Sequence, residues 1–132
     1  MISTTGEGKF KAKISNDGSS IDYELSFTGL AANIIAAHIH LAQPDVNGGI
    51  VIWLCSNLPS PPTPAGTQAC PTAATAGTVT ETITSTDVQA VSAQGIAAGD
   101  LLAVLEAMST GKTYVNIHST TFTNGEICGT IR

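Results

Sequence analysis

The strongest constraint on the fold is a run in which polar and apolar side chains alternate over the length of one β-strand. Ser20–Thr28 (SIDYELSFT) places four apolar side chains on one face. The segment Gly8–Ser15 alternates in the same way, and Asn16-Asp17-Gly18 between the two has the composition of a tight hairpin turn. These residues predict two half-buried antiparallel strands joined by that turn.

Five further segments have the composition of strands and are separated by turn residues. They are Ile34–Ala42, Ile50–Leu54, Gly77–Thr84, Tyr114–His118 and Glu126–Ile131. Ile50–Leu54 (IVIWL) is apolar throughout, which favours a strand buried on both faces with Trp53 in the core. Glu81 interrupts the apolar face of its segment, and a carboxylate at that position is typical of an edge strand.

One stretch changes from strand to helix periodicity. Gly99-Asp100 precedes Leu101–Met108, an apolar run that ends near Gly111, and this pattern predicts a short helix. The 132 residues fit one domain, residues 1–132. We therefore expect an all-β Greek-key sandwich or barrel of about seven or eight antiparallel strands with one or two short helical insertions.

Charge argues against a nucleic-acid partner, and the length of the apolar runs argues against a transmembrane segment. The net charge is −5, and the chain has only five basic residues. Nucleic-acid binding requires a basic surface that releases counterions, so we expect no nucleic-acid partner. No apolar run approaches the ~20 residues of a transmembrane helix, so we expect no transmembrane segment.

The cysteines indicate an oxidising compartment. Cys55 and Cys70 flank Ser56–Ala69, a proline-rich segment that cannot form a helix or a central strand. We expect a disulfide that closes this loop, and hence a secreted or extracytoplasmic protein whose leader is absent from this sequence. Cys128 is left over; a buried thiol, a disulfide link to a second copy in a homodimer, and a metal ligand all stay open.

The histidines suggest a metal site. His38 and His40 share one face of a strand, because strand side chains alternate between faces. The same parity places His118 opposite the core, with Glu126 and Cys128 on its side of the following strand. These five residues are candidate ligands for copper or zinc. The alternative is that the imidazoles only form structural hydrogen bonds.

Ordered motifs around these histidines resemble the CHRD domain, the module named after chordin. They are Ala37-His38-Ile39-His40, Asn47-Gly48-Gly49-Ile50-Val51, Tyr114-Val115-Asn116-Ile117-His118, Gly125-Glu126-Ile127 and Gly129-Thr130-Ile131. The resemblance covers nearly the whole chain, and the paired cysteines resemble the single-domain microbial secreted branch. It implies an exported β-sandwich with a binding or scaffold role and no established catalytic activity. The family motif usually continues with arginine where this chain has Cys128.

Three function classes follow from these observations. The first is an extracytoplasmic domain that binds copper or zinc through the three histidines. The second is a metal-independent structural or adhesive module whose partner is an extracellular protein or a polysaccharide. The third is an enzyme, which we do not expect, because the sequence has no nucleophile elbow, P-loop or dinucleotide fingerprint. A mononuclear redox or hydrolytic metal centre stays open.

Overall fold

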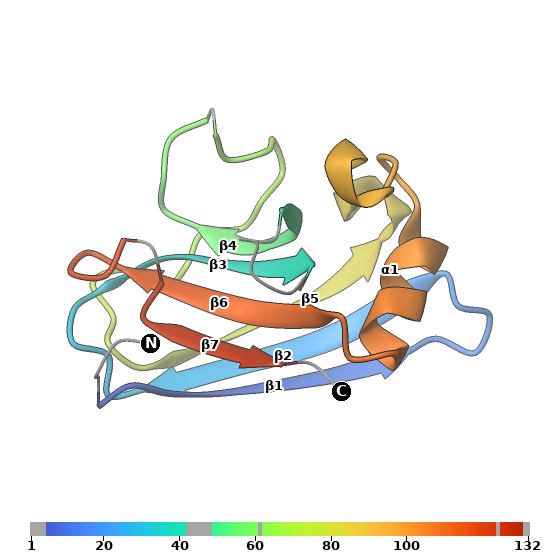
Figure 1. Ribbon diagram of the computed structural model, residues 1–132. Coiled ribbons are helices and arrows are strands. Elements are labelled where there is room, and N and C mark those ends of the chain that lie inside the picture. The colour runs from blue at the N-terminus through green and yellow to red at the C-terminus, as the bar shows by residue number, and fades with distance from the viewer. Residues whose placement is uncertain (1–4, 42–48, 61, 124, 131–132) are drawn as a thin grey trace.

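The protein is a sandwich of two antiparallel sheets (Figure 1). The computed structural model describes residues 5–41, 49–60, 62–123 and 125–130, and for 127–130 it describes the backbone alone. One sheet has the order β1-β2-β5, with β1 (Glu7–Ile14), β2 (Ser20–Thr28) and β5 (Gly77–Thr84). The other has the order β4-β3-β6-β7, with β3 (Ile34–Leu41), β4 (Ile50–Ser56), β6 (Thr113–Ser119) and β7 (Ile127–Thr130). The predicted all-β sandwich is confirmed.

The helical insertions are short, as predicted. Two 3₁₀ turns, η1 (Ser85–Asp87) and η2 (Ser92–Gln94), follow β5, and the helix α1 (Leu101–Ser109) precedes β6. The Asp100 carboxylate caps α1 by accepting a hydrogen bond from the backbone N–H of Ala103 (3.1 Å). No helix in the described part of the chain is long and apolar enough to cross a membrane.

The predicted N-terminal hairpin is confirmed, but the expected burial of its first strand is wrong. β1 pairs with β2 along its whole length, and Gly18 has the positive φ of 74° that the turn requires. β1 forms the edge of its sheet, and only Phe10 is partly buried, stacked on Tyr23. Ile14, which shares the inner face with Phe10, stays 49% exposed.

Two register shifts explain why β4 is apolar throughout. Leu54 and Val51 are the extra residues in its pairing with β3, so the strand does not alternate strictly. Both are fully buried, whereas Trp53 is only partly buried and does not belong to the core cluster. The strand is largely buried, as predicted, but the prediction that Trp53 lies in the core is wrong.

A disulfide joins Cys55, near the end of β4, to Cys70 in the proline-rich loop, as predicted. Figure 1 shows this loop (green) projecting beyond β4. Polar contacts also hold the loop: Ser56 N–H donates to the carbonyl of Gln68 (2.9 Å), and the hydroxyls of Ser56 and Thr63 lie 2.6 Å apart. Part of the loop is consequently fixed against the strand that carries Trp53.

The hydrophobic core fills the space between the two sheets. In the four-stranded sheet, β3 lies between β4 and β6. The largest fully buried side chains of the core come from both sheets and from α1; they include Ile21, Leu25, Phe27, Ile34, Ile39, Ile52, Leu54, Val104 and Ile117. Because Ile39 and Leu41 belong to this core, the alternate residues His38 and His40 lie on the outer face of β3.

Candidate metal centre

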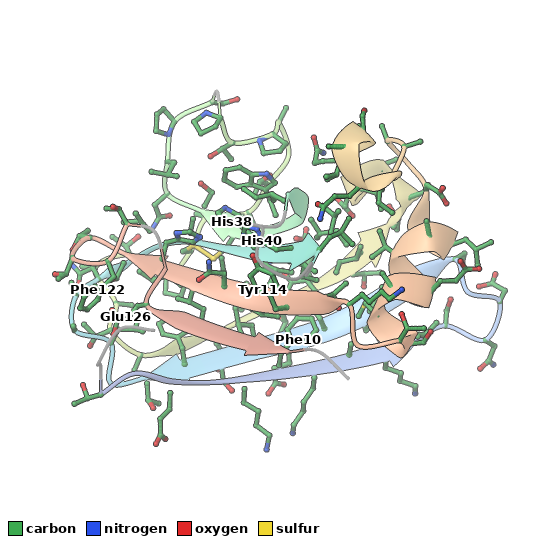
Figure 2. All side chains as sticks on the ribbon, viewed as in Figure 1. Phe10, His38, His40, Tyr114, Phe122 and Glu126 are labelled. Carbon is green, nitrogen blue, oxygen red and sulfur yellow. A yellow bond between two sulfur atoms is a disulfide. The ribbon has the colours of Figure 1, made fainter. Side chains whose placement is uncertain are left out.

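The three histidines gather on the outer face of the four-stranded sheet. In the register of β3 and β6, His38 faces Asn116 and His40 faces Tyr114, while His118 faces Ala36. His118 is therefore the diagonal neighbour of His38 on the same face. Figure 2 shows His38, His40 and Tyr114 close together over the sheet. The predicted grouping of the three imidazoles is confirmed.

Hydrogen bonds define the tautomers of two of the rings. Nδ1 of His118 lies 2.8 Å from the carbonyl oxygen of Thr123, so Nδ1 carries the proton and donates it. The Nε2 atom of a neutral His118 is then an acceptor, and His38 Nδ1–H donates to it across 3.1 Å. His38 Nε2 is left with its lone pair, buried and without a hydrogen-bond partner in the part of the chain that the structure describes.

The spacing of the imidazole nitrogens suits a metal ion. One ligand nitrogen from each of the three rings can be chosen so that all lie within 4.8 Å of one another. At metal–nitrogen distances of 2.0–2.1 Å, tetrahedral coordination places ligand nitrogens about 3.4 Å apart. The 3.1 Å between His38 Nδ1 and His118 Nε2 already approaches that value. Side-chain rotations that move atoms by about 1 Å would complete a three-histidine site.

Burial keeps the central imidazole neutral. His38 is 4% exposed and His40 is 8% exposed. Burial, together with the neighbouring rings of His118 and His40, lowers the pKa of His38 from 6.5 to about 3. Since only a neutral imidazole coordinates a metal, His38 is in the binding-competent protonation state at pH 7.

Two aromatic rings enclose the cluster. The indole of Trp53 meets the ring of His38 edge-on, with 4.2 Å between centroids. The phenol ring of Tyr114 stacks on His40 at 4.9 Å with an angle of 5° between the planes. The alternation of side chains in β6 predicts that Tyr114 lies on the same face as His118. The position of Trp53 could not be predicted, because it depends on the register shifts in β4.

Glu126, one of the five predicted ligands, is not brought into the group of three histidines. Its carboxylate is 4% exposed, and Oε2 accepts a hydrogen bond from the backbone N–H of Ala31 (2.7 Å). Figure 2 shows Glu126 at the end of the sheet where Phe122 lies, apart from His40. The glutamate therefore ties the β6–β7 hairpin to the loop between β2 and β3.

Cys128 is the fifth predicted ligand. Its backbone pairs with Asn116 in the β6–β7 ladder, and its side chain lies outside the described residues. In the turn before β7, the backbone of Gly125 lies against the side-chain amide of Asn116. Gly125 has a φ of 119°, and a Cβ there would collide with that amide. Glycine is thus required at the turn that presents the Thr123 carbonyl to His118.

The comparisons with known proteins agree with this picture. The family model of the CHRD domain matches residues 1–131. Neither the curated proteins nor the solved structures include a significant match. The matched region contains both sheets, the disulfide loop and all three histidines, and we conclude that this chain belongs to the CHRD domain family.

Proposed function

We propose that the protein is an extracytoplasmic domain that binds one copper or zinc ion through His38, His40 and His118. The observation that supports this proposal most strongly is the cluster itself: three imidazoles have ligand nitrogens within 4.8 Å of one another. A merely structural role would give each ring nitrogen a hydrogen-bond partner, yet the buried Nε2 of His38 has none among the described residues.

The donor set is compatible with both metals. Imidazole nitrogen suits copper and zinc alike, and three ligands leave a coordination position for water or another group. Coordination through His38 Nδ1 would move the proton that His38 now donates to His118 onto Nε2 of the same ring. Affinity should fall as the pH is lowered, because the imidazoles must be neutral to bind a metal.

Two observations support an extracytoplasmic location. Cys55 and Cys70 form a disulfide, and such bonds persist in oxidising compartments. The second is membership of a family named after an extracellular protein. In this setting the domain would acquire its metal outside the cytoplasm.

The decisive test is metal stoichiometry. Protein without a histidine tag, freed of metal by a chelator, is dialysed against buffered Cu²⁺, Cu⁺ and Zn²⁺, and bound metal is measured by mass spectrometry. We expect one equivalent in the parent protein and none in His38→Ala or His118→Ala. Glu126→Gln is the matched control, since Glu126 is as buried as His38 but lies outside the cluster. Equal loss in the control, or no binding by the parent, would contradict the proposal.

The alternative is a metal-independent module that binds a protein or a polysaccharide. The outer face of β1-β2-β5 would be its contact surface, because alternate residues there, including Asp22, Glu24 and Thr80, are exposed. This alternative predicts that replacement of all three histidines leaves partner binding unchanged.

A further inference from the structure

A second site lies on the other side of Trp53. A small pocket of about 30 Å³, open to solvent, lies between the proline-rich loop and the edge strand β5. Residues 64–67 of the loop form one wall, and Trp53 and Tyr23 also line the pocket. Trp53 therefore contacts His38 of the histidine cluster and also lines this pocket.

Glu81 belongs to this pocket, which accounts for its position on the inward-facing side of a strand. It pairs with Tyr23 in the register of β2 and β5, on the face that elsewhere carries Val79 and Ile83. Gln68 Nε2 donates to Glu81 Oε2 and to the Tyr23 hydroxyl, at 3.1 and 3.0 Å. The carboxylate is thereby oriented by the disulfide-closed loop.

The lining is acidic as well as aromatic. Asp87 also lines the pocket, and its Oδ2 accepts the backbone N–H of Thr84 at 2.9 Å. Among the described residues that line the pocket there is no lysine, arginine or histidine. The pKa of Tyr23 is raised mainly by burial and further by the negative charges of Glu81 and Asp87.

We propose that this pocket binds an organic ammonium group, held by the carboxylates of Glu81 and Asp87 and by the indole of Trp53. A cation is attracted both to carboxylates and to the face of an aromatic ring, and tryptophan is the best aromatic partner. A neutral sugar would also stack on the indole, but it would gain no energy from two carboxylates that no cationic side chain of the described lining neutralises. The lining therefore favours an amine over a neutral carbohydrate.

The test uses metal-free parent protein and pairs of probes that differ only in charge. Butylammonium is compared with butan-1-ol, choline with 3,3-dimethylbutan-1-ol, and methyl glucoside represents a neutral sugar. Binding is followed by the NMR shifts of the Trp53 indole N–H and of the backbone amides of residues 65–67. We expect saturable shifts at these positions with both ammonium probes and at least about tenfold weaker binding of their neutral counterparts.

Two double variants test whether the carboxylates of the pocket cause the preference for ammonium probes. Glu81→Gln/Asp87→Asn should weaken butylammonium binding about tenfold, whereas Asp22→Asn/Glu24→Gln should not change it. The control pair is exposed on the same sheet and does not line the pocket. Three results would overturn the proposal: equal binding of the neutral alcohols, preference for the sugar, or no saturable shift. Because the probe pairs are compared on the parent protein, they decide the question even if a variant fails to fold. The metal proposal does not depend on this outcome.

Discussion

His38 Nδ1 lies 3.1 Å from His118 Nε2, and the hydrogen bond between them occupies the position where a metal ion would link the same two atoms. The Thr123 carbonyl fixes His118 in the tautomer that leaves Nε2 as the acceptor. The metal-free protein thus already holds one ligand nitrogen in the orientation for coordination. A metal that binds both nitrogens requires the proton of His38 to move from Nδ1 to Nε2 of the same ring.

The buried His38 should make folding sensitive to mild acid. Its pKa is about 3 in the folded protein and 6.5 in a model compound, so the unfolded chain binds the additional proton. This contribution to stability is complete above pH 6.5 and is lost as the pH falls from 6.5 toward 3. The free energy of unfolding of the metal-free protein should drop by about 2 kcal/mol between pH 7.5 and pH 5, as measured by urea denaturation.

His38→Asn is the control for this pH effect, because it removes the titrating group. The variant should be less stable at pH 7.5 and should lose much less stability between pH 7.5 and pH 5. The same dependence in both proteins would show that groups other than His38 cause it.

The fluorescence of Trp53 should distinguish bound copper from bound zinc. It is the one tryptophan of the chain, and its ring centroid lies 4.2 Å from that of His38. Cu²⁺ bound at the histidines should therefore quench its fluorescence strongly, whereas Zn²⁺, a closed-shell ion, should not. Zinc added afterwards should reverse the quenching only to the extent that it displaces copper. Quenching that persists in His38→Ala would place the copper elsewhere.

Glu126→Gln should separate structure from metal binding. The substitution leaves an acceptor for the Ala31 N–H but removes the charge of a carboxylate that is 4% exposed. We expect the free energy of unfolding to fall by about 1 kcal/mol, since charge-assisted hydrogen bonds are stronger than neutral ones. Metal affinity measured by competition with a chelator should stay unchanged. A large loss of affinity would restore the glutamate as a ligand.

The disulfide should contribute to stability on a predictable scale. Cys55 and Cys70 are 15 residues apart in sequence, and closure of a loop of that length is worth about 3 kcal/mol. The variant Cys55→Ala/Cys70→Ala should unfold at a correspondingly lower urea concentration. A loss below about 1 kcal/mol would indicate that the contacts of Ser56 and Thr63 hold the loop without the covalent bond.

The features that follow from strict alternation could be predicted from the sequence. Side-chain parity placed the three histidines on one face, because β3 and β6 alternate regularly where the histidines lie. The hairpin turn at Gly18 was predictable for the same local reason, since only a few residue types accept its backbone conformation. The proline-rich composition likewise indicated which two cysteines pair.

Features that depend on tertiary context could not be predicted. Two register shifts in β4 turn Trp53 out of the core and against His38, and no periodicity in IVIWL signals them. Glu126 accepts a hydrogen bond from a backbone amide 95 residues away, which side-chain parity could not reveal; parity placed Glu126 on the His118 side and so suggested a ligand. The exposure of β1 follows from its position at the sheet edge, which an isolated alternating pattern does not reveal.

Anomalous diffraction from a crystal soaked in copper or zinc tests the central claim most directly. We predict one strong anomalous peak at about 2.0–2.1 Å from a nitrogen of each of His38, His40 and His118. The hydrogen bond between His38 and His118 would then be absent, with both nitrogens bound to the ion. A crystal that binds metal only at other residues, or that keeps the 3.1 Å hydrogen bond at saturating metal, would contradict this account.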